Sequence, residues 1–406
     1  MRQSEGWAAG SGAQAQVEAH PAPNPLDRLL APTTRKAFFA DHHEQQPLFC
    51  GSSEPRSYDG LLTLAAVDAV VASADLRHDM LRLVAGGDPV DPSRYISPDG
   101  RVLPAALAEA YLRGATVVLP QLHRSVAAIA DFCSALEGEF SAAVQANAYL
   151  TPAAAQGFEP HYDQHDVFIL QIHGTKTWRL YGTPRAAAGG TPFERGRHEP
   201  GAVSAEYTLQ PGDCLYIPRG LMHEAANEGS EPSLHLTIGV LPKRWCDLVL
   251  DAVAALVRDD AAFHRALPPG FATRRDAAQL AEQHFAPLLA AVASGTRLDQ
   301  ALERAARDFL HERRPNVAGV LASPRPEGPL RRRPLVLWRA TRDASDLILT
   351  GPGGDLRFSG SDEAALTQAL SGEAFDPRLL AAPDPARLVD RLWANGYLEQ
   401  APEPVL

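Results

Sequence analysis

A short stretch of the chain, residues 158–182, contains a histidine and an aspartate two positions apart, just before an apolar run typical of a buried strand. Side chains in an extended segment alternate between its two faces, so His161 and Asp163 point the same way. One imidazole and one carboxylate on a common face are two of the three ligands of a 2-His-1-carboxylate site, which holds non-haem Fe(II). The pattern therefore predicts a metal site that needs one more ligand.

The segment PGDCLYIPRGLMHEA supplies a candidate for this third ligand. His223 follows a strand pattern and a Pro-Arg-Gly turn, and it lies 62 residues beyond His161, which leaves enough chain for several intervening strands. Closure of a β-barrel brings distant strands together around one site. We therefore expect His161, Asp163 and His223 to be the catalytic residues and to hold the metal together.

Strand patterns dominate the part of the chain that contains these residues, and helical patterns are almost absent from residue 144 to residue 240. Turns rich in Gly and Pro separate the candidate strands, which are 115–119, 144–150, 166–172, 176–181, 207–210, 214–217 and 234–240. Many short strands of this kind are typical of a barrel or a sandwich. We predict a double-stranded β-helix, the jelly roll of the cupins.

Other patterns flank the predicted jelly roll. Residues 1–24 lack periodic apolar positions and are predicted to be a disordered tail, whereas the segment from 25 to about 113 is mostly helical and completes a unit spanning 25–242. Apolar residues recur at helical spacing from 243 to 328, and residues 329–406 combine short strands and helices as in a winged helix. The predicted fold class is therefore mixed α and β.

The composition excludes several classes of protein. A formal net charge of −11 disfavours sequence-blind binding to nucleic acid through phosphate neutralisation. Residues 330–406 contain nine Arg, no Lys and eleven acids, so we also expect no sequence-specific DNA binding there. The sequence has no run of about 18 apolar residues and does not begin like a secretory signal, so we expect no membrane span and a cytoplasmic protein. The four cysteines are far apart and are predicted to be reduced thiols.

Four ordered blocks of sequence carry a resemblance to a known family. They are NAYLTP, QGFEPHYDQHDVFILQIHGTKTWRLYG, GDCLYIPRGLMH and SLHLTIGV. Together they resemble the cupin-type JmjC ribosomal oxygenases, which are protein hydroxylases that use Fe(II), 2-oxoglutarate and O2. The resemblance covers roughly residues 25–400. It implies a helical dimerisation region at 243–328 and a winged-helix-like domain at 329–406.

The resemblance implies the same three metal ligands and adds residues for the cosubstrate. Lys176 would bind the distal carboxylate of 2-oxoglutarate, and Asn147 and Tyr149 would help to hold it. A charge count agrees with this role for Lys176. Fe(II) with one carboxylate carries one positive charge, dianionic 2-oxoglutarate makes the site one negative, and one lysine neutralises it.

Some residues have more than one interpretation. His235, on the last predicted strand, would either contact the cosubstrate or be a hydrogen-bonded core histidine. His165 shares the face of Asp163 and is expected to form a pocket wall or to face solvent. Trp178 and Phe168 would either pack inside the barrel or contact the substrate, and we expect the packing role.

The resemblance implies hydroxylation of an Arg or His side chain of a ribosomal protein, with Arg as our first guess, and an acidic enzyme suits such a basic substrate. Hydroxylation of a peptide natural product would use the same iron site with a different pocket mouth. A non-catalytic binding module built from a cupin and a winged helix belongs to another class, and we would expect it to have lost a ligand or Lys176. The apolar stripes after Pro242 need a partner, which could be other parts of the same chain, whereas the resemblance implies a homodimer.

Overall fold

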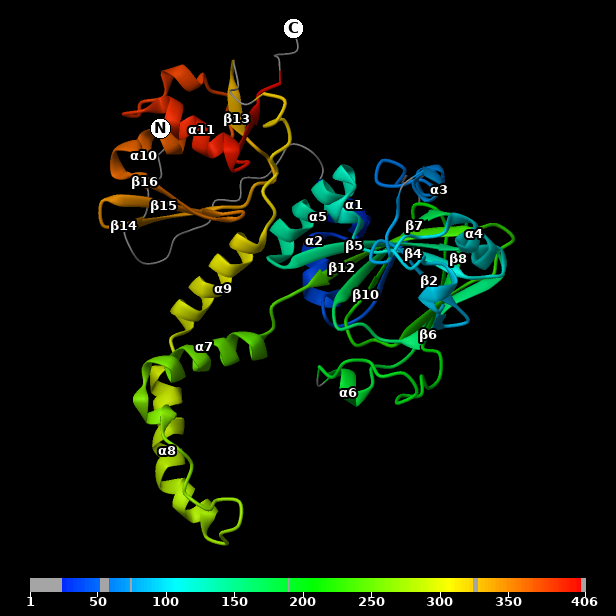
Figure 1. The fold of residues 1–406 in the computed structure, drawn as a ribbon, viewed down its shortest axis with the longest axis horizontal. Coiled ribbons are helices and arrows are strands. Elements are labelled where there is room, and N and C mark those ends of the chain that lie inside the picture. The colour runs from blue at the N-terminus through cyan, green and yellow to red at the C-terminus, as the bar shows by residue number, and fades with distance from the viewer. Residues whose placement is uncertain (1–23, 52–57, 74, 189, 324–327, 403–406) are drawn as a thin grey trace. The chain divides into compact units, whose positions relative to one another are not determined.

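The computed structural model describes residues 24–51, 58–73, 75–188, 190–323 and 328–402 (Figure 1). Of the tail predicted at 1–24, all but Asn24 lies outside the described residues. The chain divides into two compact units, one spanning 19–242 and the other including 243–406. In the described part of the chain, no helix combines the length and the apolar character that crossing a membrane requires.

Two antiparallel sheets form the first unit (Figure 1). The larger sheet has the strand order β1-β10-β7-β12-β5-β4-β2-β3, and the smaller has the order β6-β11-β8-β9. The strands are β1 Leu48–Cys50, β2 Arg82–Ala85, β3 Asp88–Pro89, β4 Thr116–Leu119, β5 Ala143–Thr151, β6 Ala155–His161, β7 Asp166–His173, β8 Lys176–Leu180, β9 Ala205–Leu209, β10 Cys214–Ile217, β11 His223–Asn227 and β12 Ser233–Leu241. From β5 to β8 and again from β9 to β12, successive strands alternate between the sheets, so this is the predicted double-stranded β-helix.

The central strands of the larger sheet are buried on both faces. Every residue of β7 except its last is buried, and so is every residue of β12 except its last. One face packs against helices and the other against the smaller sheet, which explains why β7 reads as a continuous apolar run instead of an alternating one. The helices of this unit are α1 Pro25–Leu30, α2 Arg35–Ala37, α3 Leu64–Ser73, α4 Pro104–Leu112, α5 Ala127–Phe140 and α6 Arg185–Ala188.

The structure corrects the sequence analysis at several strands. The segment from 25 to 113 is not only helical, because β1, β2 and β3 extend the larger sheet at both of its edges. These strands have two to four residues, too few for a period of two to stand out from a helical pattern. Strand β11, with the sequence HEAAN, was also missed, since Glu, Ala and Asn have weak β propensity.

The second unit begins with three helices, α7 Trp245–Asp259, α8 Ala277–Gly295 and α9 Leu298–Glu312. None of the 19 residues of α8 is buried within this chain. The remaining elements are β13 Leu330–Arg332, β14 Arg339–Asp343, β15 Asp346–Gly351, β16 Gly354–Ser359, α10 Glu363–Ala369, α11 Pro385–Ala394 and β17 Leu398–Gln400. They surround a separate apolar core whose central residues include Leu349, Leu366 and Leu392.

Candidate metal and cosubstrate site

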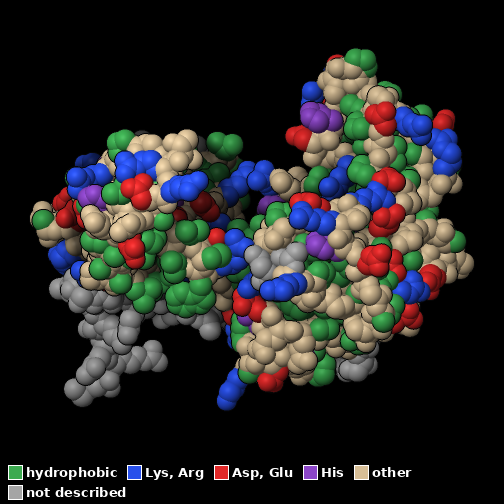
Figure 2. Space-filling view, turned by 90° about the horizontal axis from the view of Figure 1, so that it is seen from below, with side chains coloured by type: hydrophobic (Ala, Val, Ile, Leu, Met, Phe, Trp, Pro, Cys, Tyr) green, Lys and Arg blue, Asp and Glu red, His purple; other side chains and the backbone are tan. Residues whose placement is uncertain are grey.

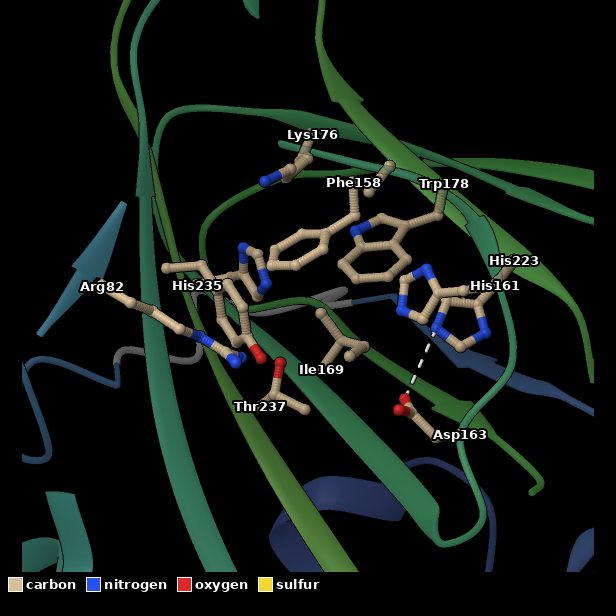
Figure 3. A pocket seen from close by; sticks show the side chains of 12 residues that line it. Arg82, Phe158, His161, Asp163, Ile169, Lys176, Trp178, His223, His235 and Thr237 are labelled. Atoms are coloured by element: carbon tan, nitrogen blue, oxygen red, sulfur yellow. Dashed lines mark ion pairs between the residues drawn. The ribbon is translucent and has the colours of Figure 1, made fainter. Parts of the chain in front are cut away.

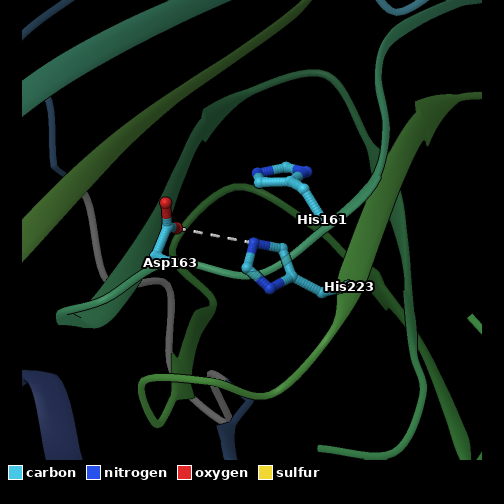
Figure 4. A group of neighbouring side chains, drawn as sticks. All are labelled: His161, Asp163 and His223. Carbon is cyan, nitrogen blue, oxygen red and sulfur yellow. Dashed lines mark ion pairs between the residues drawn. The ribbon is translucent and has the colours of Figure 1, made fainter. Parts of the chain in front are cut away.

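The three predicted ligands converge inside the jelly roll (Figure 4). One ligand atom from each of His161, Asp163 and His223 lies within 4.8 Å of the other two. The two histidines come from neighbouring strands, because His223 at the start of β11 is the direct cross-strand partner of His161 at the end of β6. Their ring centroids are 4.6 Å apart, and Nε2 of His223 lies 3.7 Å from a carboxylate oxygen of Asp163.

Hydrogen bonds to the main chain orient both imidazoles for metal binding. Nδ1 of His161 lies 2.8 Å from the carbonyl oxygen of Glu159, and Nδ1 of His223 lies 2.9 Å from that of Leu221. A carbonyl oxygen only accepts, so each Nδ1 carries the proton and donates it. Each Nε2 is then an unprotonated donor atom, as a metal-bound histidine requires. These residues therefore fit a divalent transition metal.

The protonation states at neutral pH also suit a cation. Burial, together with the neighbouring His161, lowers the pKa of His223 to about 4, so this imidazole is neutral. Burial alone would raise the pKa of Asp163, but the adjacent imidazoles outweigh it and hold this pKa below its ordinary value. The imidazole of His223 and the carboxylate of Asp163 are therefore both in the form that binds a cation.

A buried ion-pair cluster anchors the two segments that carry the ligands. Asp166, which is 1% exposed, accepts hydrogen bonds from the backbone N–H and the guanidinium of Arg219, at 2.9 and 3.2 Å. The same guanidinium donates to Glu44 at 2.8 Å. The backbone N–H of Gly220 donates to the carbonyl oxygen of Asp163. The Pro-Arg-Gly turn before His223 is thus tied to the segment around Asp163.

This cluster also accounts for a second group of potential ligands, His43, Glu44 and Asp166, whose ligand atoms also lie within 4.8 Å of one another. Arg219 already bridges the two carboxylates with its positive charge. A metal ion there would have to displace a guanidinium that makes charge-assisted hydrogen bonds to both acids. The group is therefore a structural ion pair.

Lys176 lies inside the barrel and lines the same cavity as the three ligands (Figure 3). The cavity has a volume of about 190 Å³. Lys176 is 2% exposed, and its ammonium group donates to the hydroxyl of Thr151 at 2.8 Å. Burial lowers the pKa of Lys176 to about 7, because none of the ion pairs between described residues gives it a carboxylate partner. A carboxylate bound in the cavity would supply the missing counter-charge.

The other residues predicted to bind the cosubstrate lie in different positions. Tyr149 and His235 line the cavity, where their rings stack at 4.8 Å with an interplanar angle of 3°. They face each other because they are cross-strand partners on β5 and β12. Asn147 is not among the side chains that line the cavity, and its side-chain oxygen accepts a hydrogen bond from the backbone N–H of Gln121.

The structure also shows where Trp178, Phe168 and His165 lie. Trp178 lines the cavity and lies 6.0 Å from the ring of His223, whereas Phe168 faces the helical side of the larger sheet and contacts Phe38. The ring of His165 lies over Gly239 on β12, so closely that a Cβ atom at this glycine would come within 2.6 Å of it.

Sequence reasoning missed one charged residue of the site. Arg82, on β2, lines the cavity although it lies 79 residues before His161. Its strand is the neighbour of β4 in the larger sheet, outside the strands that carry the four sequence blocks. No spacing rule connects so short a strand to the metal ligands, so the sequence held no usable signal for Arg82.

Comparisons with known proteins agree with the fold. The JmjC domain family matches residues 121–248. Ribosomal oxygenase 1 of Gallus gallus is 31% identical over 317 residues, which cover 71% of this chain and 51% of the relative. The bifunctional lysine-specific demethylase and histidyl-hydroxylase NO66 of Dictyostelium discoideum is 35% identical over 238 residues, covering 55% of this chain and 44% of the relative. The chain thus spans about half the length of these two curated relatives.

A solved structure has a similar fold. The ribosomal oxygenase YcfD of Escherichia coli, in complex with cobalt and 2-oxoglutarate, matches with a TM-score of 0.50 and 16% identity, over 91% of this chain and 98% of that chain. At this identity the likeness concerns the fold alone. Residues 121–248 therefore match the JmjC domain family, and the chain is similar over part of its length to ribosomal oxygenase 1 and NO66.

Proposed function

We propose that this chain is an Fe(II)- and 2-oxoglutarate-dependent dioxygenase that hydroxylates an Arg or His side chain of a basic ribosomal protein. The observation that carries the proposal is the ligand cluster, in which His161 and His223 both have Nδ1 tied to a carbonyl oxygen and Asp163 completes the triad. Lys176 supports it, because its buried ammonium group has no carboxylate partner among the described residues.

Each residue has a separate task in this mechanism. His161, Asp163 and His223 would hold ferrous iron by three ligands, which leaves positions for the keto acid and O2. When bound, iron, 2-oxoglutarate and O2 would supply the oxidation: one oxygen atom of O2 would turn a substrate C–H bond into C–OH, and the other would enter the succinate that forms with carbon dioxide from 2-oxoglutarate. The protein positions the reacting groups and excludes water.

The cosubstrate would be held mainly by charge and by shape. Lys176 would pair with the distal carboxylate, and the stacked rings of Tyr149 and His235 would form one wall of the cavity. Asn147 would act through Tyr149, since its side chain interacts with the Tyr149 hydroxyl and is not part of the cavity lining. This role for Asn147 is less direct than the one that the sequence resemblance implies.

The names of the relatives and the net charge of −11 support a basic ribosomal protein as the proposed substrate. The charge is not gathered into one acidic field on the face seen in Figure 2, where basic and acidic side chains are interspersed. We therefore expect recognition to depend on local pairing near the cavity mouth. We also propose a cytoplasmic location, where such a substrate would be available.

We also propose that the helices at 243–328 form a homodimer. All 19 residues of α8 lack burial within this chain, and Phe285 and Leu289 on this helix are 60% and 53% exposed. Trp245 on α7 is 74% exposed. Apolar side chains this exposed are typical of an interface, and a second copy would cover them symmetrically. Analytical ultracentrifugation of the whole chain tests this proposal.

The C-terminal unit at 329–406 is proposed to be winged-helix-like without reading DNA. Its arginines are largely paired with acids, as in Arg331 with Glu399 and Arg342 with Glu363. Paired guanidinium groups contribute little to phosphate binding, because the acid must be displaced first. Fluorescence anisotropy with a labelled duplex should therefore detect no binding at physiological salt.

The decisive experiment incubates the purified protein with Fe(II), 2-oxoglutarate and ribosomal proteins, and then searches by mass spectrometry for the gain of one oxygen atom. Asp163→Ala serves as the control that lacks one ligand. Hydroxylation only by the wild type supports the proposal. Turnover of 2-oxoglutarate without any modified ribosomal protein would favour another peptide as substrate, and absence of metal binding would leave a non-catalytic binding module.

A further inference from the structure

The cavity contains a second cationic residue, Arg82, in addition to Lys176. Figure 3 shows the Arg82 side chain at a different edge of the cavity from Lys176. Its guanidinium interacts with the neutral hydroxyl of Tyr149. Unlike Lys176, Arg82 is exposed to solvent, so it lies where the cavity opens. An arginine remains charged at every physiological pH.

The acids near Arg82 do not cancel this charge. Asp88 follows Arg82 on the neighbouring strand β3, and Glu159 lies two residues before the ligand His161. Both carboxylates pair with Arg195 instead, Glu159 at 2.7 Å. The ion pairs between described residues include none for Arg82. Asp163 does sense the charge of Arg82 electrostatically, but its carboxylate is counted with the metal, so the described residues give Arg82 no acid of its own at the cavity opening.

This charge changes the balance of the loaded site. A divalent cation with Asp163 carries one positive charge, dianionic 2-oxoglutarate makes the site one negative, and Lys176 brings it to zero. Arg82 then leaves one positive charge beside the space that a substrate side chain must enter. A guanidinium or ammonium group would be repelled there, whereas a neutral group would not.

We propose that Arg82 is a specificity-determining residue that excludes cationic side chains, so that the side chain hydroxylated in this cavity is uncharged when it binds. This inference rests on the proposed function. Between the two candidates named there, it selects the neutral imidazole of a histidine over the guanidinium of an arginine. The basic character of the substrate protein then serves recognition outside the cavity, where the side chains of the protein offer both signs of charge.

The test compares two small probes of nearly equal shape that differ by one charge, butylguanidinium and butylurea. Protein loaded with Mn(II) and 2-oxoglutarate is titrated with each probe, and the paramagnetic relaxation of the probe protons reports binding next to the metal. Uptake of Mn(II) is first scored by electron paramagnetic resonance. The variants are Arg82→Gln and, as a matched control, Arg179→Gln, because Arg179 on β8 pairs with Glu206 and Glu228 on the outside of the barrel.

We expect the wild type and Arg179→Gln to bind butylurea at least about tenfold more tightly than butylguanidinium, and Arg82→Gln to bring the two within about threefold. Equal binding of both probes by the wild type would overturn the inference. So would a large loss of 2-oxoglutarate affinity in Arg82→Gln, which would assign Arg82 to the cosubstrate. Binding of neither probe would also contradict it, because no side chain of this size would then reach the metal. Failure of Mn(II) uptake would instead refute the proposed function itself.

Discussion

Lys176 offers a test in which a residue needed for function makes the resting protein less stable. The ammonium group is buried, and its partner among the described residues is the hydroxyl of Thr151, so the folded protein disfavours its charged form. Lys176→Met removes the charge and keeps a side chain of similar length. We expect this variant to be more stable than the wild type in the absence of 2-oxoglutarate, and to gain no stability when 2-oxoglutarate is added.

The magnitude follows from the pKa. A fall from 10.5 to about 7 corresponds to roughly 5 kcal/mol of free energy that opposes folding at or below pH 7. Loss of the hydrogen bond to Thr151 offsets about 1 kcal/mol of this in the variant. Because the folded pKa lies below the unfolded one, the wild type regains stability as the pH rises from 7 to 10.5. The advantage of Lys176→Met should thus fall to about 1 kcal/mol at pH 9.

The assay is urea unfolding followed by circular dichroism at pH 6.5 and at pH 9. A parallel titration with Co(II) identifies the unfolding transition of the unit that holds the metal ligands, and the free energies are taken from that transition in the metal-free protein. Lys36→Met is the matched control, because Lys36 is an exposed lysine of the same unit and should change the free energy of unfolding by less than about 0.5 kcal/mol. A Lys176→Met protein less stable than the wild type at pH 6.5 would refute the reasoning. It would mean that the ammonium group already has a counter-charge in the resting protein.

The remaining predictions concern the ligands and their support. His223→Ala should abolish both Co(II) absorption and succinate formation without changing the circular dichroism, and retained metal binding would remove His223 from the ligand set. Arg219→Met removes the guanidinium that pairs with the buried Asp166, so it should lower the free energy of unfolding by about 3 kcal/mol and weaken metal binding at least tenfold. The control Arg179→Met breaks only exposed ion pairs and should lower the free energy of unfolding by less than about 1 kcal/mol. Calorimetry at pH 8 in two buffers should show uptake of nearly one proton when 2-oxoglutarate binds, because Lys176 must recharge. Deletion of the chain after Gly328 should leave metal binding intact, since the ligands all lie in the unit that ends at Pro242.

The ligand cluster could be predicted because two of its three residues are close in sequence and few histidines could supply the third. His161 and Asp163 share a face by simple alternation, and His223 stood out as a histidine after a strand and a turn. The jelly roll followed from the spacing of apolar strands. The seven predicted strands correspond to β4, β5, β7, β8, β9, β10 and β12, with ends that differ by at most two residues.

Other features could not be predicted because they depend on the tertiary fold. Asn147 and Tyr149 lie two positions apart, yet only Tyr149 lines the cavity, because the Asn147 side chain bonds the loop at Gln121. Arg82 enters the site through a four-residue strand that no periodicity reveals. Asp166 anchors the turn at Arg219 across 53 residues of sequence.

The two ends of the cavity differ in whether their polar groups already have partners. The metal end is made of groups whose own hydrogen bonds are satisfied, since each imidazole donates to a carbonyl oxygen and keeps one nitrogen for the cation. The opposite end holds an ammonium group to which the described part of the chain gives no counter-charge. A molecule that bears a carboxylate at one end and metal-binding oxygens at the other satisfies both ends at once. The unpaired state of Lys176 therefore selects a dicarboxylate over a monocarboxylate keto acid, because only the former relieves the cost of burying this lysine.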